Sequence, residues 1–502
     1  MADATQQAVK TEGKTQELSL KRFLSSMRLS TEINEPVPII QDDLRVVKED
    51  VSDEDRFISG MAALLLNIDP AVKRLDKGMV LEVIGRIDEM VNDQLNEIIH
   101  HEKFKRMESN WRSLHQLILT TNFKANIMID ILDVSKDELY EDFESNAVDI
   151  LGSAFFKKVY VAEYDQFGGK PYGAIAGLYE FDHTPGDEFW LRIMGKISAA
   201  SHAPFIGAVS SRFFGCNSIE ELAAIKDLEG LMNQPKYGSW NKLRDSEEAA
   251  YIGLALPKII IRLPYDPDTN PCNNLSFREK VRGDSNEDYL WGSAVIPFAQ
   301  NMIRSFEQSG WCQYLRGPKG GGLVAGLPVH MFNMRGEDEI KIPVEMAIPD
   351  YRELEFANAG FMPLVYRKGT ADACFFSCQS LKKPKKFKDP KDSENSQLVT
   401  NLSYTFSITR IAHYVKCIMR DNIGSSADAP YIKNTLQNWI FQYVTTVVDP
   451  DDLTLRYYPF KAASVTVVER EGMIGWYDCS ISILPHIQFE GMDVELKLDA
   501  RL

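Results

Sequence analysis

The glycine-rich segment at residues 317–322, GPKGGG, is the part of the sequence that most resembles a catalytic motif. It has the composition of a phosphate loop, in which backbone amides surround a phosphate group. A phosphate loop needs Lys-Ser or Lys-Thr directly after its last glycine, and here Leu323 and Val324 follow Gly322. The segment therefore predicts a tight turn or a close approach of two backbones, and not a nucleotide site.

Histidines and cysteines do not form a metal site in the sequence. His100 and His101 are adjacent, so on a helix they point about 100° apart and cannot share a metal as an i, i+4 pair does. Cys374 and Cys378 lie in an apolar segment without a second pair at metal-binding spacing, which favours buried thiols without a ligand. No Gly-x-Ser-x-Gly elbow or cysteine-protease signature is present. We expect no catalytic residue, no metal and no cofactor, which favours an assembly or binding protein over an enzyme.

A lysine cluster lies in the charged segment LKKPKKFKDPKDSENS at residues 381–396. Its members are Lys382, Lys383, Lys385, Lys386 and Lys388. Phe387 is the lone aromatic among them, whereas platforms for single-stranded nucleic acid use several stacked aromatics. We interpret the segment as a solvated loop or as a patch that pairs with an acidic neighbour, with phosphate contact as the less favoured alternative.

Composition describes a globular chain with an acidic surface. The 502 residues include 72 acidic and 56 basic side chains, for a formal charge of −16 and a pI near 5.1. Such a chain is a poor generic binder of nucleic acid or anionic membrane. Seven cysteines favour a reducing compartment, and neither a secretory signal nor an apolar run of about 20 residues is visible. We expect a cytoplasmic protein without membrane insertion and with about three domains.

Hydrophobic periodicity divides the chain into four predicted parts. Residues 1–57 form an N-terminal arm, and 58–121 are helical, with apolar residues at three- and four-residue spacing on one face. That face comprises Val80, Ile84, Ile87, Val91 and Leu95. Residues 122–400 alternate strands with helices, which predicts an α/β domain, and residues 401–502 form a smaller domain of helices followed by strands. The expected fold class is mixed α/β in several domains.

The individual elements follow from the same patterns. In the central domain, strands are expected at 125–134, 158–162, 173–179, 204–209, 258–263 and 363–366, and helices at 136–150, 186–201, 218–225, 240–250 and 289–308. In the C-terminal domain, helices are expected at 403–421 and 430–446, and strands at 463–470, 476–484 and 493–498. The last strand alternates Val494, Leu496 and Leu498 with charged residues, which makes it a candidate for pairing with a sheet of another chain.

Several segments, kept in order over about four-fifths of the chain, resemble the large subunit of the type VI secretion contractile sheath, the TssC/VipB/EvpB family. The similar blocks lie at 104–114, 167–174, 200–205, 235–265, 289–292, 310–330, 360–387, 410–421 and 484–498. They include FKRMESNWRSL, FGGKPYGA, ASHAPF, GWCQYLRGPKGGGLVAGLPVH and LPHIQFEGMDVELKL. The glycine turn and the lysine cluster both fall inside this pattern.

The resemblance implies a structural protein that polymerises with a small sheath subunit of the TssB/VipA type around an inner tube of the Hcp type. Contraction of the sheath would then drive the tube outward from a baseplate. An AAA+ unfoldase, of the ClpV type or another, would disassemble the contracted sheath. The alternative is a sheath subunit of a related phage-tail-like injection device.

Two interfaces are expected within such a sheath. The apolar helix face at residues 80–95 would bind the small subunit, and the C-terminal strands would form a sheet completed by strands from neighbouring chains. The acidic segment at 42–55 is expected to meet the lysine cluster across an interface, because an evenly spread negative charge would oppose polymerisation.

Overall fold

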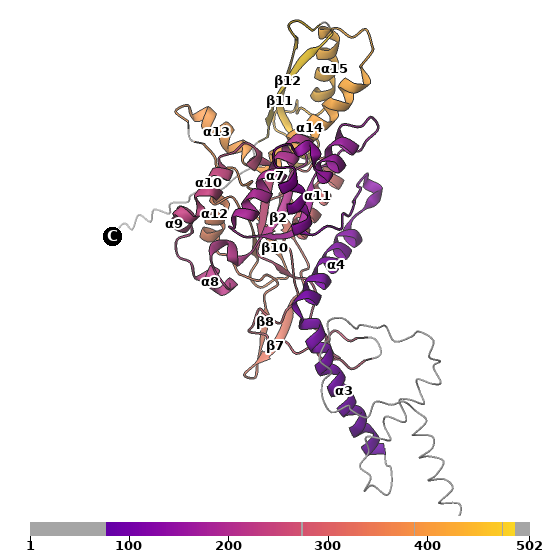
Figure 1. Ribbon diagram of the computed structural model, residues 1–502, viewed down its shortest axis with the longest axis vertical. Helices are drawn as coiled ribbons and strands as arrows, with labels where there is room; N and C mark the ends of the chain where they lie inside the picture. Colours follow the sequence, from indigo (N-terminus) through magenta and orange to yellow (C-terminus); the bar gives the residue numbers. More distant parts are fainter. Residues whose placement is uncertain (1–76, 273–274, 386, 474, 487–502) are drawn as a thin grey trace, which may run out of the picture. The chain divides into compact units, whose positions relative to one another are not determined.

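The computed structural model describes residues 77–486 apart from 273, 274, 386 and 474 (Figure 1). The chain divides into two compact units, and their described parts are 77–105 with 264–282, and 106–263 with 283–486. The four predicted domains stay predictions. The arm at 1–57, the acidic segment at 42–55 and the strand at 493–498 lie outside the described residues.

The first unit is built on a long helix. Helix α3 spans Lys77–His100, and after a bend at His101 helix α4 (Glu102–Thr120) begins in this unit and continues into the second one. The helical prediction for this region is confirmed over 77–120, and the part before 77 is not described.

The second unit contains a six-stranded mixed sheet in the order β1-β2-β3-β9-β10-β6. Strands β1 (Ile175–Phe181), β2 (Phe205–Val209), β3 (Ile252–Leu256) and β9 (Met362–Tyr366) are parallel. Strands β10 (Ala373–Phe375) and β6 (Leu323–Val324) continue the sheet antiparallel. Every residue of β2 and β3 is buried, as expected for parallel strands covered on both faces.

Helices cover both faces of this sheet. Phe205 and Val209 of β2 pack in one core with Trp190 and Ile197 of α7 (Pro185–Ser201). The alternate residues Ile206 and Ala208 pack in a second core with Val295 and Phe298 of α11 (Val295–Ser309). Because successive side chains on a strand point to opposite faces, the two cores lie on opposite sides of the sheet and the body has three layers (Figure 1).

Shorter elements complete the body around the sheet. The helices are α5 (Lys136–Ser145), α6 (Ala154–Phe156), α8 (Ile219–Ala224), α9 (Leu228–Met232), α10 (Gly238–Arg244), α12 (Asp350–Asn358) and α13 (Pro390–Val399). The strands form two small antiparallel pairs: β4 (Ile259–Ile260) with β5 (Trp291–Gly292), and β7 (His330–Met334) with β8 (Glu337–Lys341).

The C-terminal part combines helices with a hairpin. Helices α14 (Leu402–Asp421), α15 (Ala429–Phe441) and α16 (Asp452–Tyr457) precede the antiparallel strands β11 (Phe460–Glu469) and β12 (Tyr477–Pro485). A third core, with Leu436, Ile440, Phe460 and Val465, joins α15 to the hairpin. The expected helices and the first two expected strands of this part are confirmed, with α15 ending at Phe441, before the predicted 446.

Four predicted elements of the central region are wrong, two of them entirely and two in part. No strand forms at 125–134, where Asn126 adopts a left-handed conformation with φ of 59°. Residues Lys157–Tyr164 form a π-helix instead of the strand at 158–162, because Ser153 caps a helix whose side chains Phe155, Phe156 and Val159 are buried at helical spacing. Only Ile259–Ile260 is a strand within 258–263. Helix α13 occupies part of the predicted loop at 381–396.

The remaining strands and helices of the central region are confirmed in kind and differ in their bounds. The largest differences are at 240–250, which splits into α10 and a 3-10 turn at Glu248–Tyr251, and at 289–308, where α11 begins at Val295. The expected mixed α/β class is confirmed by the layered sheet and its helices.

Candidate functional site

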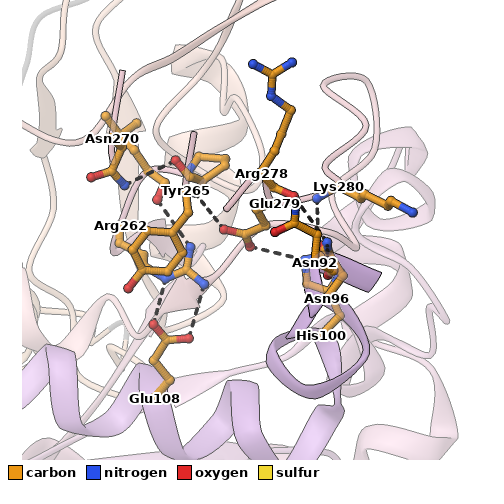
Figure 2. A network of polar contacts seen from close by, with 12 residues as sticks. Asn92, Asn96, His100, Glu108, Arg262, Tyr265, Asn270, Arg278, Glu279 and Lys280 are labelled. Carbon is orange, nitrogen blue, oxygen red and sulfur yellow. Dashed lines mark hydrogen bonds and ion pairs between the residues drawn. The ribbon is translucent and has the colours of Figure 1, made fainter. Parts of the chain in front are cut away.

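One side of α3 is bonded to the segment 264–282 of the same unit. Asn92, Asn96 and His100 are spaced by four residues and therefore lie on one side of the helix (Figure 2). The Asn92 side-chain amide donates to the Ser276 carbonyl (3.3 Å), and Asn96 donates to the carbonyl of Arg278 (3.2 Å) and accepts from the backbone N–H of Lys280 (2.7 Å). These bonds fix the rotation of α3 within its unit.

His100 extends the same polar contact to a buried carboxylate. Its Nε2 lies 3.2 Å from Oε1 of Glu279, and the backbone N–H of Tyr265 donates to the other oxygen of Glu279 at 2.9 Å. Glu279 is 7% exposed, so its partners compensate the loss of water. His100 therefore has a structural role in the contact between α3 and the segment 264–282. The sequence signal that could have found the contact is the run of uncharged polar residues at four-residue spacing between charged ones.

The predicted interface face of α3 is turned away from these bonds. Counted along the helix, Ile84, Val91 and Leu95 lie about a third of a turn from the Asn92–Asn96–His100 side. Ile84 and Val91 are each 38% exposed, and Leu95 is partly buried. Val80 and Ile87 lie on the same helix, and their side chains are outside the described residues. An apolar helix side that its own unit leaves exposed is a candidate binding surface.

Helix α4 has the same two-sided construction within the second unit. The hydroxyl of Ser109 donates to the Trp291 carbonyl (2.7 Å), and Ser113 and Leu117 are buried. Glu108 accepts from the guanidinium groups of Arg262 (2.7 Å) and Arg112 (2.6 Å), as Figure 2 shows for Arg262. The inner side of α4 is thereby tied to the body.

The outer side of α4 carries an exposed apolar stripe. Met107 and Trp111 are 50% and 66% exposed, and Ile118 on the same side is 39% exposed. Trp111 and Leu117 are apolar residues of the same helix, and the structure buries only Leu117. The stripe is a second candidate binding surface.

The β11–β12 hairpin is a two-stranded sheet. Its inner face, with Val465, Ile481 and Ile483, packs in the C-terminal core. At the start of β11, Phe460 is bridged to Val444, and its carbonyl accepts from Thr445 at 2.9 Å. Among the described residues, no further strand pairs with β11 or β12, and the bridge from Val444 involves β11 only at Phe460. The parts of the two edges that these residues leave unpaired are candidate sites for an added strand. The residues predicted to take part in strand exchange, Val494, Leu496 and Leu498, lie outside the described residues.

The glycine turn at 317–322 is a close approach of two backbones, as predicted. The N–H of Gly317 donates to the Phe375 carbonyl (2.7 Å), and the N–H of Phe375 donates to the Gly322 carbonyl (3.0 Å). A Cβ atom at Gly322 would collide with the Phe375 carbonyl oxygen. On the turn, the Lys319 carbonyl accepts from Arg456 of α16 (2.8 Å). The turn therefore holds the C-terminal helices to the body.

The lysine cluster is only partly solvated, which corrects the interpretation of a solvated loop. Lys382 is buried at 6% exposure and forms an ion pair with Glu247 of the same chain, and this bond lowers the pKa of the Glu247 carboxyl. Lys383, Lys385 and Lys388 are exposed. The alternative of pairing with an acidic neighbour thus holds for Lys382, with Glu247 as the neighbour.

The cysteines and the other possible metal ligands do not form a reactive site among the described residues. Cys374 and Cys378 are buried as predicted, and burial raises the pKa of the Cys374 thiol to about 12, so it is not a nucleophile at neutral pH. Among the described residues, no group of three or more His, Cys, Asp or Glu side chains could hold a metal ion. The described helices include none that is long and apolar enough to span a bilayer.

Helices α3 and α4 with exposed apolar sides, and a β11–β12 sheet of two strands, are features typical of a subunit that assembles with other chains. The chain belongs to the EvpB/VC_A0108 tail sheath family, because the model of the N-terminal sheath domain matches residues 81–382 and that of the gpW/gp25-like domain matches residues 391–502.

The chain is similar in sequence to a known protein and is compared below with chains of two solved structures. The chain is 42% identical over 427 residues to the type VI secretion system sheath protein TssC1 of Pseudomonas aeruginosa strain PAO1, covering 84% of this chain and 85% of the relative. A chain of the anti-feeding prophage baseplate has a TM-score of 0.37 at 10% identity, covering 75% of this chain and 84% of that one. A chain of the contracted anti-feeding prophage sheath has 0.31 at 13% identity, covering 63% and 68%. The predicted function, a structural subunit of a type VI secretion contractile sheath, is confirmed by the family and the TssC1 relative.

Proposed function

We propose that the chain forms a heterodimer with a small sheath subunit of the TssB/VipA type through the exposed apolar sides of α3 and α4. This proposal rests on one observation: each helix is hydrogen-bonded to its own unit on one side and leaves its apolar side exposed. Asn92 and Asn96 on α3, and Ser109 on α4, hold the opposite sides of the helices to their own units. The apolar residues are thereby presented outward at fixed rotation, which lowers the entropy that binding would otherwise cost.

The heterodimers polymerise in the cytoplasm through the β11–β12 hairpin. An added strand bonds through its backbone, so the connection tolerates tilting of the bodies that it joins. One edge strand is supplied by the C-terminal segment with Val494, Leu496 and Leu498, and another by the N-terminal arm of a neighbour. The polymer surrounds an inner tube of the Hcp type, starts at a baseplate and is recycled by an AAA+ unfoldase of the ClpV type or another.

The chain acts in this machine without catalysing a reaction. Rigid bodies rotate while the exchanged strands keep them connected, and the driving energy is the difference between extended and contracted interfaces. The family consists of tail sheath proteins, and TssC1 is named as one, which supports a structural role.

The heterodimer is tested by placing charges on the apolar side of α3. Ile84→Asp with Val91→Asp should abolish co-purification with the small subunit, because an unpaired carboxylate in an apolar interface costs several kcal/mol. Glu89→Ala with Glu97→Ala, two exposed acids on the same helix, is the matched control and should co-purify normally. Retention of the small subunit by the Asp variant would show that the apolar side of α3 is not the interface.

A further inference from the structure

The segment at residues 126–134, NIMIDILDV, has the sequence of a strand and no strand partner within the chain. It is rich in isoleucine and other apolar residues, as strands are. From residue 127 to 130, partly buried and exposed side chains alternate, as on a strand that is covered on one face. Yet among the residues that the structure describes, none forms a backbone hydrogen bond with residues 127–133. The segment therefore has the composition and burial of a strand without its ladder of hydrogen bonds.

Side-chain contacts hold this segment beside the sheet of the second unit. The Tyr172 hydroxyl donates to the Asp130 carboxylate at 2.9 Å, and the Tyr179 hydroxyl donates to the Val134 carbonyl at 2.7 Å. Tyr179 belongs to β1, which is the outermost strand of the sheet. The path of the segment is thus fixed before any partner binds, which lowers the ordering entropy that an added strand would cost.

The exposed apolar stripe of α4 continues into this segment. Ile118, near the end of α4, is 39% exposed, and Phe123, in the turn that follows the helix, is 49% exposed. Three apolar residues of the segment come next, Met128, Ile131 and Leu132, with 62%, 53% and 45% exposure. Exposed apolar residues therefore recur from α4 to Leu132 without a change of compact unit. A partner that covers the stripe of α4 reaches the segment along the chain.

Both properties of the segment call for the same kind of partner. Water can bond the exposed backbone groups, but it does not offset the cost of exposing the apolar side chains. A strand that is added alongside bonds the backbone and covers the side chains together. We infer that the small sheath subunit adds a strand to residues 127–133. This inference rests on the proposed heterodimer and extends its interface from α4 to the segment beside β1. The strand that the sequence predicts at 125–134 then forms only in the complex.

Hydrogen–deuterium exchange of the purified heterodimer tests the added strand directly. The amides of 127–133 that face the partner strand should exchange about 100-fold more slowly than amides without a hydrogen bond, because they gain carbonyl acceptors that their own chain does not supply. Exchange at the unbonded rate, in a heterodimer that co-purifies intact, would overturn the inference and leave the proposed heterodimer standing. Failure of the wild-type chains to co-purify would contradict the proposed function itself.

A pair of charge substitutions tests whether the small subunit supplies this strand. Ile131→Asp with Leu132→Asp should lower the amount of small subunit retained by the tagged chain about tenfold, since two apolar side chains of the interface are replaced by carboxylates. The chain should still fold, because both side chains are exposed. Val148→Asp with Leu151→Asp changes two exposed apolar residues elsewhere in the same unit and should retain the small subunit normally.

The two measurements together identify the occupant of the segment. Slow exchange at 127–133 with normal retention of the small subunit by the Ile131→Asp, Leu132→Asp variant would overturn the inference, because the acceptors would then come from this chain's own N-terminal arm or from a second copy. Slow exchange together with reduced retention is the result that we expect.

Discussion

His413 of α14 gives stability a dependence on pH. Its Nε2 donates to the Ser201 carbonyl at 3.0 Å, and burial together with nearby His202, Arg410 and Lys416 lowers its pKa from 6.5 to about 4. The unfolded chain therefore binds this proton near pH 6.5 and the folded chain only near pH 4. The contribution of neutral His413 to the free energy of unfolding is fully present above pH 6.5 and is lost as the pH falls from there to 4. Between pH 7 and pH 5 the loss is about 2 kcal/mol.

His413→Gln isolates this effect, because the glutamine amide can still donate to Ser201 and does not titrate. Urea unfolding at pH 7 and pH 5 should show a smaller loss of stability for the variant than for the wild type, by that same margin of about 2 kcal/mol. His202, whose pKa burial also lowers, stays in both chains and cancels in the comparison. An identical pH dependence of variant and wild type would contradict the prediction.

Local chemistry at single residues was predictable, and distant partners were not. The glycine spacing at 317–322 identifies a tight turn by itself, because the demand on the backbone is local. Lys382 looks like its exposed neighbours in sequence, and its burial depends on Glu247, which lies 135 residues away. The hydrogen bonds of Asn96 could not be predicted for the same reason, because its partners, residues 278 and 280, are also far away in the sequence.

At the scale of elements, periodicity identified most strands and helices and failed where two patterns overlap. Residues 158–162 have the β-branched and aromatic composition of a strand, yet Ser153 and the buried aromatic residues before them impose a helix. The exposed stripe of α4 shows a second limit of periodicity, which does not tell which side of a helix is buried. Periodicity marks which residues share a helix side, and only packing decides that Leu117 faces the body while Trp111 faces outward.

The two-stranded β11–β12 sheet leads to a prediction for a C-terminal truncation. Removing residues 487–502 deletes Val494, Leu496 and Leu498 and should leave the heterodimer soluble, because the hairpin core with Val465 and Ile481 is retained. Long tubes should be absent by electron microscopy, since the chain no longer supplies the strand that links its neighbours. Removing only residues 499–502 is the control. Normal tubes from the longer truncation would exclude this segment from strand exchange.

At the scale of the whole molecule, the C-terminal part is built into the central body. Trp311 belongs to the region matched by the N-terminal sheath model, yet its ring lies in the C-terminal core, 5.1 Å from Tyr443 and 5.3 Å from Phe460 between centroids. Arg456 of α16 reaches back to Lys319 and also donates to Gln308 at 2.5 Å. The regions matched by the two sheath models are therefore joined by side-chain contacts.

Trp311→Ala should uncouple these parts. The indole is 3% exposed, so its truncation should cost about 3–5 kcal/mol through lost contacts and the cavity left behind. The lost contacts join the C-terminal core to the chain segment matched by the N-terminal sheath model. Calorimetry of the heterodimer should therefore show a separate, earlier transition of the C-terminal part, whereas the wild type should unfold its second unit in one step. Trp476→Ala, which truncates an indole 62% exposed beside β12, should leave the transition within about 0.5 kcal/mol of the wild type. A single, equally cooperative transition in Trp311→Ala would show that the two parts are joined by other contacts, such as the bond from Arg456 to the glycine turn.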